Sequence, residues 1–420
     1  MKILFLSFFL LLNNFLFAQT TLSEYISLAQ LNNPIINDNR NLSEITRLES
    51  ERLKAFYSKP QVFLSGGATY SPFFNNAGYT NSDPSPQAIG YDLAISNGGI
   101  YSGTLNVNQS IFNRSRYQAN VAFVKVAGLI NSNFAKLTEH DLERFITDQY
   151  IICYQDLQQI IYIAGVIKLL NEQKNLIQSL VDNGLLKQSD LTLLNIEHQT
   201  QQVLNNTFKA TYKRDLMSLK ALAGVGDTSV VEILDPALSL SGQVENSKYM
   251  EKFRLDSLNA VANQSFFDLR YKPQTILFAN TGFNAVQLPG IERKFGLSAG
   301  FTFNLILFDG GQRNINRQKT KLSIKTVSGY QNNFFAQNTV RKNQALQELN
   351  AVEDRINLIN SQLDAYKQLM ATYKQELLRG QISVINYINT IKLYVTLQRD
   401  LVITRSNRLL LINAYNYWNW

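Results

Sequence analysis

The longest hydrophobic pattern in the chain has a helical period. Between Ile356 and Leu377, apolar residues recur every three or four positions, which is typical of a coiled-coil seam. The seam positions are 356, 359, 363, 366, 370, 373 and 377. The pattern also occurs 196 residues earlier, at 160, 163, 167, 170, 174, 177 and 181, where Lys174 is the polar exception. The sequence therefore predicts two copies of one long amphipathic helix.

Short motifs indicate that the chain contains an internal two-fold repeat. The tripeptide Lys59-Pro60-Gln61 recurs as Lys272-Pro273-Gln274, each time between a helix-like segment and a strand-like segment. Further along, Ile111-Phe112-Asn113 corresponds to Leu307-Phe308-Asp309. Because repeated motifs in the same order mark repeated structural units, we expect two halves with the same elements.

A glycine interrupts each of the long helical patterns. Gly184 lies 72 residues after Phe112, and Gly380 lies 72 residues after Phe308. A helix of about 70 residues extends roughly 105 Å at 1.5 Å per residue. Helical periodicity resumes after each glycine, and glycine readily adopts the left-handed conformation that ends a helix. We therefore expect each half to form a long antiparallel helical hairpin with its tip at the glycine.

Between the Lys-Pro-Gln motifs and the long helices, the period changes from about 3.5 to 2. From Phe295 to Leu307, apolar residues occupy the odd positions, and glycine or polar residues occupy the even positions as far as Asn304. This alternation over about ten residues is typical of a barrel strand that crosses a bilayer. Weaker alternation marks the segments 62–70, 101–110 and 275–283. An ordinary soluble antiparallel sheet alternates in the same way, so that alternative stays open.

Loops at about 72–99 and 285–294 would join the strands in pairs. Four strands cannot close a barrel, and lipid does not tolerate open sheet edges. If the strands are transmembrane, the chain must therefore oligomerise, and three copies would supply 12 strands and 12 helical rods. The predicted fold class is a mixed α+β membrane protein. Its coiled-coil hairpins would form an α-barrel, and its strands would form a shared 12-stranded β-barrel. The sequence requires that the barrel be closed, but it does not fix the number of copies at three.

The first residues predict export. Residues 1–18 carry Lys2, then an apolar run, and end on Ala18, which is the pattern of a secretory signal peptide. A transmembrane anchor fits less well because Asn13 and Asn14 interrupt the run, which is shorter than the roughly 20 residues of a spanning helix. The formal charge of +8 is spread along helical faces without a dense basic block, which argues against nucleic acid as a partner.

The sequence offers few groups for chemistry. Its cysteine, Cys153, lies within a helical pattern, and its histidines, His140 and His198, have no Cys or His at ligand spacing. Gly310-Gly311 lacks the spacing of a phosphate-binding loop, and we expect it to form a strand-to-helix corner. We therefore expect no enzyme activity, no metal site and no cofactor.

The order and spacing of these features resemble the outer-membrane efflux protein family, often called the TolC family. The resemblance covers nearly all of the mature chain. The residues that carry it are Leu22-Ser23-Glu24-Tyr25-Ile26, Leu28-Ala29 and Asn32-Asn33-Pro34 of an opening helix, the strand entries at Pro60 and Pro273, Leu222-Ala223-Gly224 at the end of the first half, Leu307-Phe308-Asp309-Gly310-Gly311, and the two tip glycines.

The resemblance implies a homotrimer in the outer membrane, whose strands form one barrel and whose hairpins form a tunnel extending into the periplasm. Such ducts dock to a periplasmic adaptor, also called a membrane fusion protein, and to an inner-membrane transporter, and they export drugs, metals or proteins. The implied function is therefore the exit duct of a tripartite efflux or type I secretion system.

The resemblance also implies roles for residues at the hairpin tips, where the inner end of the tunnel is held shut. The expected adaptor contacts are Asn183, Gly184, Leu185, Arg379, Gly380 and Gln381. Relatives often place aspartates six and nine residues after the second tip glycine as an acidic ring at the constriction, but here these positions are Asn386 and Asn389. Asp190, six residues after Gly184, would supply one such ring; it would equally serve as a first-turn carboxylate that stabilises the following helix.

The expected organisation is a signal peptide at 1–18, a first repeat at 19–224, an equatorial connector at 225–247 and a second repeat at 248–420. The repeats would contain β-hairpins at about 61–112 and 274–308, with helical tips near 184 and 380. Two alternatives stay open. A periplasmic adaptor would have one hairpin and compact β-domains, and a structural coiled-coil tether of the envelope would not need the alternation of Phe295 to Leu307.

Overall fold

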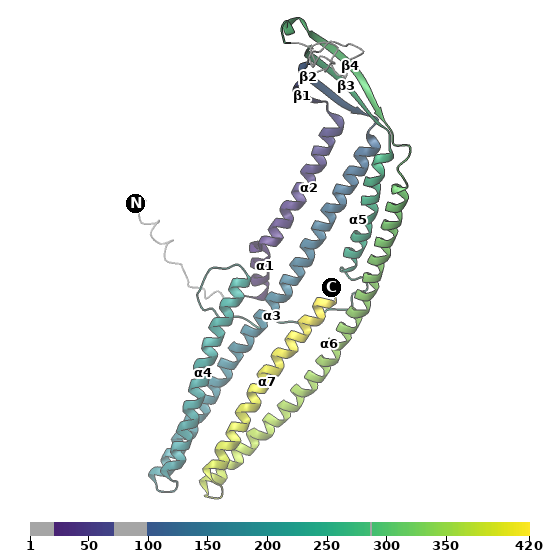
Figure 1. Cartoon of the computed structure of the whole chain (residues 1–420). Helices are drawn as coiled ribbons and strands as arrows, with labels where there is room; N and C mark the ends of the chain where they lie inside the picture. Colours follow the sequence, from purple (N-terminus) through teal and green to yellow (C-terminus); the bar gives the residue numbers. More distant parts are fainter. Residues whose placement is uncertain (1–20, 71–98, 286–287) are drawn as a thin grey trace, which may run out of the picture. The chain divides into compact units, whose positions relative to one another are not determined.

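The computed structural model describes residues 21–70, 99–285 and 288–420 (Figure 1). The signal peptide expected at 1–18 lies outside these ranges, as does nearly all of the loop expected at 72–99. The chain divides into two compact units. Of the described residues, the helical unit comprises 21–40, Phe134–Met250 and Gln331–Trp420, and the strand unit comprises 41–70, 99–133, 251–285 and 288–330.

The described chain is mostly helical, with one small antiparallel sheet, which confirms the coarse fold class predicted from the sequence. The helices are α1 (Leu22–Asn32), α2 (Pro34–Ser58), α3 (Arg114–Asp182), α4 (Gln188–Leu222), α5 (Met250–Asp268), α6 (Gln312–Leu378) and α7 (Val384–Trp418). The strands are β1 (Gln61–Tyr70), β2 (Gly99–Ile111), β3 (Gln274–Ala285) and β4 (Phe295–Asn304). Two short 3₁₀ helices, η1 (Leu269–Tyr271) and η2 (Ile291–Arg293), precede β3 and β4.

The sheet of the strand unit has the order β1-β2-β3-β4, with every neighbouring pair antiparallel. Its register gathers most apolar positions of the strands on one face, while Phe63, Ile276 and Phe278 lie on the other. Cross-strand rows on the apolar face are Val62–Val107–Ala279–Ala299 and Leu64–Leu105–Thr281–Leu297. Leu64 and Leu297 are each 79% exposed. Within the described residues, this apolar face is therefore left uncovered.

The other face of the sheet carries polar cross-strand hydrogen bonds. The hydroxyls of Ser65 and Thr104 lie 3.0 Å apart, and the Ser298 hydroxyl donates to the Asn280 side-chain oxygen at 2.8 Å. These residues occupy the opposite parity to the apolar rows, as the alternation along β4 predicted. The sheet thus has one apolar face and one polar face.

The last strand is shorter than its hydrophobic pattern. The alternation predicted a strand as far as Leu307, but β4 ends at Asn304, which pairs with Gln274 at the start of β3. Pro273 precedes Gln274 and has no N–H to donate to the ladder, so pairing stops there. Beyond it, Gly310 and Gly311 adopt φ values of +66° and +83° and turn the chain into α6, as the sequence predicted for this corner.

The helical unit is built on helical pairs. Figure 1 shows α3 running antiparallel beside α4, and α6 beside α7. α3 has 69 residues and α6 has 67, while α4 and α7 have 35 each. The described helices include none with the length and hydropathy needed to cross a membrane.

The buried stripe of α3 differs slightly from the predicted seam. Ile163, Leu170 and Ile177 are fully buried, as expected, but Val166 and Gln173 are buried at 2% and 4% exposure, while the predicted positions 167 and 174 are half-buried. The stripe is shifted because α3 packs against α7 as well as α4: residues of both hairpins form one apolar cluster. That cluster contains Ile163, Val166, Leu170, Ile177, Leu191, Leu194, Leu377, Val384, Tyr387, Ile388, Ile391 and Val395.

Candidate functional site at the hairpin tips

The first tip is a tight turn between α3 and α4. Gly184 has a φ of +73°, a left-handed conformation that an L-residue rarely adopts. The Gly184 N–H donates to the Val181 carbonyl at 2.9 Å, and the Leu185 N–H donates to the Leu180 carbonyl at 2.9 Å. This pair of bonds is a Schellman motif, which satisfies carbonyls at the end of α3. Leu185 is 68% exposed at the outside of the turn.

The second tip repeats this geometry between α6 and α7. Gly380 has a φ of +70°, its N–H donates to the Leu377 carbonyl at 3.0 Å, and the Gln381 N–H donates to the Glu376 carbonyl at 2.9 Å. Asn183, Arg379 and Gln381 are exposed, as both tip glycines are. The two tips therefore present short, exposed turns of the same backbone shape, with Leu185 in one and Arg379 in the other.

The residues proposed for the constriction lie in the first turns behind the tips. The Asp190 carboxylate accepts the Lys187 N–H at 3.1 Å, so it stabilises the start of α4. In α7 the equivalent place is held by Asn386, whose N–H donates to the Ser383 hydroxyl at 3.4 Å. Asp190 is half-buried, and both Asn386 and Asn389 are exposed. The first-turn role of Asp190 is thus observed, while its role in an acidic ring stays a prediction.

Polar contacts between the two hairpins were missed by the sequence analysis. The Tyr387 hydroxyl on α7 donates to the Gln173 side-chain oxygen on α3 at 2.9 Å, and both side chains are buried. Five residues further along α7, the Lys392 ammonium lies 2.9 Å from the Glu197 carboxylate on α4. Glu197 also accepts from the Gln201 side-chain amide at 2.8 Å. We call Gln173, Glu197, Tyr387 and Lys392 the hairpin joint.

The predicted seam did not identify this joint, because it contained position 174 and not Gln173. In the structure Gln173 lies on the buried stripe of α3, where a polar residue requires a hydrogen-bonding partner. Its partner Tyr387 lies 214 residues away, so periodicity cannot identify it. Burial also raises the pKa of Tyr387 to about 12, so this phenol stays protonated and can donate.

The histidines have packing roles. The His140 ring is stacked between the rings of Tyr417 and Trp420, with centroids 4.8 and 4.1 Å away, and its Nε2 lies 3.0 Å from the Tyr417 carbonyl. Burial lowers the pKa of His140, which favours the neutral ring. His198 is half-buried on α4. Cys153 is fully buried, and burial raises the pKa of its thiol to about 12, which makes it a poor nucleophile.

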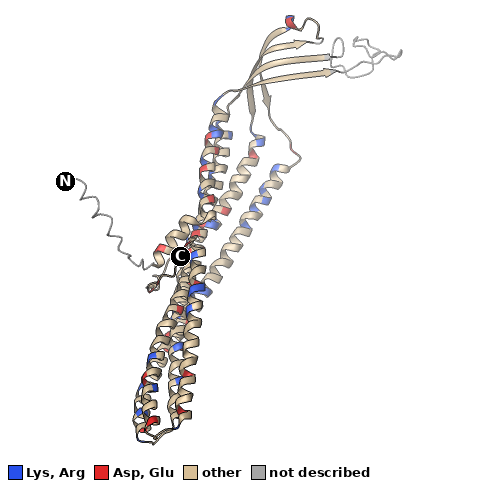
Figure 2. Cartoon of the chain, turned by 90° about the vertical axis from the view of Figure 1, so that its left-hand side faces the viewer, with Lys and Arg blue, Asp and Glu red and all other residues tan. Residues whose placement is uncertain are grey.

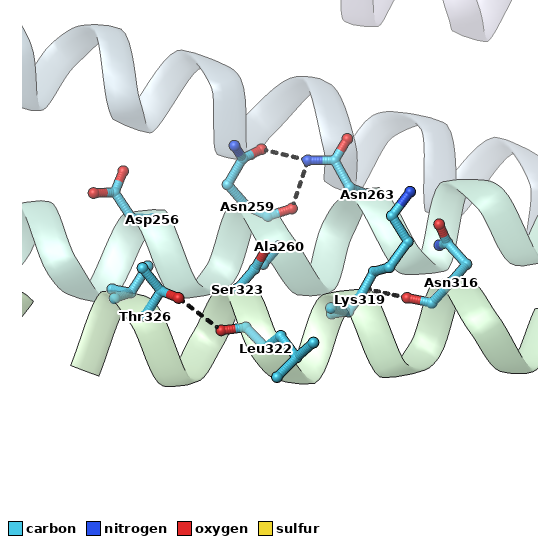
Figure 3. Close-up of a pocket in the computed structure, with 11 residues that line it drawn as sticks. Asp256, Asn259, Ala260, Asn263, Asn316, Lys319, Leu322, Ser323 and Thr326 are labelled. Atoms are coloured by element: carbon cyan, nitrogen blue, oxygen red, sulfur yellow. Dashed lines mark hydrogen bonds between the residues drawn. The ribbon is translucent and has the colours of Figure 1, made fainter. Parts of the chain in front are cut away.

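A groove in the strand unit lies between α5 and α6 and has a volume of about 710 Å³ (Figure 3). α5 supplies Asp256, Asn259 and Asn263, and α6 supplies Asn316 and Lys319. The Asn263 amide is already bonded to Asn259, at 2.8 Å to its carbonyl. The hydroxyls of Thr320, Ser323 and Thr326 also line this groove, and those of Thr320 and Thr326 donate to carbonyls within α6, each at 3.0 Å.

The described residues form neither a metal-binding cluster nor the turn that a hydrolase nucleophile motif requires. Among the described residues, no three His, Cys, Asp or Glu side chains come together as a metal site. Gly296-Leu297-Ser298-Ala299-Gly300 matches the G-x-S-x-G pattern of a hydrolase nucleophile, but that motif requires a strand-to-helix turn. Here it lies within β4, and its serine hydroxyl is bonded to Asn280.

Comparison with solved structures identifies the fold. The outer membrane protein VceC of Vibrio cholerae superimposes with a TM-score of 0.71 at 15% identity, over 95% of each chain. The open-state MtrE outer membrane channel of Neisseria gonorrhoeae gives 0.70 at 11% identity, over 95% of this chain and 88% of that one. The CmeC outer membrane channel of Campylobacter jejuni gives 0.66 at 13% identity, over 96% and 86%. This chain has the fold of these outer-membrane proteins.

This shared fold accounts for the elements described above, since the match spans nearly the whole chain, sheet and hairpins together. No family model matches this sequence, and no curated protein matches it in a sequence comparison. At 11–15% identity, the fold is retained while the sequence has diverged widely. The resemblance seen in the short motifs is thereby confirmed at the level of the fold.

Proposed function

We propose that this chain is a TolC-family exit duct, which carries substrates through the outer membrane for a tripartite efflux or type I secretion system. The observation that carries the proposal is the uncovered apolar face of an open four-stranded sheet in a chain that shares the fold of VceC. In water this face would be a liability, because exposed apolar strands with free edges aggregate. In a bilayer it is the required outer surface.

Closure of the sheet requires other copies of the chain. Within the described residues, β1 and β4 are edge strands, and unpaired backbone groups are costly in lipid. Three copies would form one 12-stranded barrel in which β4 of one protomer pairs with β1 of the next. The helical hairpins would then form a tunnel on the periplasmic side, and Asp190 would place one carboxylate per protomer near its inner end.

The exposed tip turns are the proposed adaptor contacts. Asn183, Gly184 and Leu185 in one turn, with Arg379, Gly380 and Gln381 in the other, would meet a periplasmic adaptor bound to an inner-membrane transporter. The proposed role is passive conduction and not catalysis. A periplasmic adaptor is the alternative, but its single hairpin does not match a chain with two hairpins and a sheet.

A pair of lysine substitutions on neighbouring residues of β4 tests the membrane assignment. Leu297→Lys places a charge on the apolar face, which costs about 2–4 kcal/mol near the middle of a bilayer. Ser298→Lys places the same charge on the polar face, toward the proposed water-filled lumen. Membrane-inserted protein resistant to carbonate extraction should fall sharply for Leu297→Lys and remain near wild type for Ser298→Lys. Equal insertion of both variants would contradict the assignment of the faces.

A further inference from the structure

Four segments of the strand unit meet between the sheet and the helices. The Asn113 side-chain amide donates to the Tyr57 carbonyl at 2.8 Å, and the Arg116 guanidinium donates to the Lys272 carbonyl at 2.7 Å. The Arg313 guanidinium lies 5.1 Å from the centre of the Tyr271 ring. We call residues 57–60, 111–117, 268–273 and 305–317 the junction layer.

The junction layer carries much of the positive charge of the chain. It contains seven lysine and arginine residues and two carboxylates, Asp268 and Asp309, a surplus of five positive charges. The whole chain has a surplus of eight. Figure 2 shows lysine and arginine at the helix ends next to the strands. The charge looked dispersed along the sequence because it comes from four separate segments, which the fold brings together.

The carboxylates of the layer are already engaged. Asp268 lies 3.0 Å from Arg313 and 3.5 Å from Arg317, and Asp309 accepts the backbone N–H groups of Gly311 and Arg313. The other five cations form no ion pair with any described residue. They are Lys59, Arg114, Arg116, Arg270 and Lys272. Three of them, Lys59, Arg114 and Arg270, are exposed, so the layer offers cations without counter-ions.

Large apolar side chains project from the same layer. Phe112, Leu307 and Phe308 are 87%, 89% and 87% exposed. Phe112 has a φ of +52°, a conformation uncommon for a residue other than glycine. Exposed aromatic and aliphatic groups beside unpaired cations are the combination that binds an anionic lipid surface, because the apolar groups enter the acyl boundary while the cations meet phosphate.

We propose that the junction layer binds the phosphate groups of anionic phospholipids in the leaflet next to the helices. This inference rests on the proposed function, since it requires β1–β4 to lie in the bilayer. The layer begins directly at the strand ends, where the headgroup region extends roughly 5–8 Å beyond the hydrocarbon core. Each cation near such a surface contributes about a fivefold gain in affinity for the anionic lipid.

The test compares vesicles of phosphatidylcholine with vesicles containing 20 mol% phosphatidylglycerol, using the full-length oligomer. After insertion, detergent extraction and purification, the phosphatidylglycerol retained per protein is measured by mass spectrometry. The test variant is the triple substitution Lys59→Gln, Arg114→Gln and Arg270→Gln. The matched control, Lys209→Gln, Lys213→Gln and Lys374→Gln, removes the same charge from exposed helix positions outside the layer.

Wild type and control should retain phosphatidylglycerol several-fold above its share of the vesicle lipid, and the test variant should retain no more than that share. The conservative variant Arg114→Lys with Arg270→Lys should keep the enrichment, which separates lost charge from lost folding. Inorganic phosphate at millimolar concentration should not displace the lipid; full displacement would overturn the lipid assignment. Insertion without enrichment would overturn this inference alone. Failure of the wild type to insert into either vesicle would instead overturn the proposed function.

Discussion

The hydrogen bond between Tyr387 and Gln173 is the clearest quantitative test of the hairpin joint. Removing the Tyr387 hydroxyl with Tyr387→Phe leaves the ring in the apolar cluster but deprives the buried Gln173 oxygen of its donor. An unsatisfied buried acceptor costs about 1–3 kcal/mol. Since Phe preserves the apolar packing around the ring, we expect a loss near 1–2 kcal/mol, or a rise of about 5- to 30-fold in local opening.

Hydrogen exchange of the purified protein, followed by mass spectrometry, measures that opening. Peptides covering the α3–α4 and α6–α7 tips should exchange faster in Tyr387→Phe, because local opening exposes their amides. Tyr373→Phe, on the half-buried face of α6, is the matched control and should change little. In the double variant Tyr387→Phe with Gln173→Leu, both polar partners are removed, so much of the loss should be recovered. Unchanged exchange in the single variant, or strictly additive effects, would refute the assigned role of this bond.

Three other perturbations give independent expectations. Burial and the neighbouring Asp215 raise the pKa of Asp156 to about 7, above its ordinary value of 3.8. As the pH rises, the unfolded chain therefore loses this proton at a lower pH than the folded protein does. The stability from this group should therefore be full below pH 4 and decline as the pH rises to 7. Asp156→Asn should raise the melting temperature at pH 8 and flatten that decline; an unaltered pH profile would contradict the assignment. Gly380→Ala should destabilise the second tip by about 1–2 kcal/mol because of its positive φ, whereas Gly329→Ala, within α6 and with open space around it, should stabilise the helix slightly in thermal melts. Truncating the buried partner of the ion pair, as in Glu197→Ala, should lower the melting temperature more than Glu376→Ala, at a half-buried position of α6 outside the joint. Equal shifts would count against a joint at this position.

Much of the local structure was predictable because its physical cause is local. The alternation of β4 follows from one apolar and one polar face, and the left-handed glycines at 184 and 380 follow from the need to end two long helices. β3 alternates poorly because Ile276 and Phe278 lie on the polar face, yet its pairing with β2 and β4 still fixes it as a strand. The early end of β4 depends on its partner strand, so its own hydrophobic pattern could not show it.

The hairpin joint and the junction layer were beyond sequence reasoning for a different reason. Tyr387 and Gln173 are 214 positions apart, and their bond exists only because two hairpins pack together. The cations of the junction layer come from four segments, none of which is a basic run by itself. Such features depend on tertiary contacts, which neither spacing nor composition encodes.

The central claim is that several copies of this chain form one membrane-inserted duct. Its most direct test is the mass of the particle extracted from outer membranes in detergent, by light scattering corrected for bound detergent, with its shape by negative-stain microscopy. We predict a trimer with a helical tunnel on the order of 100 Å long, as the rise of the long helices requires. A monomer recovered from the soluble periplasmic fraction would contradict the barrel, the duct and the lipid contact together.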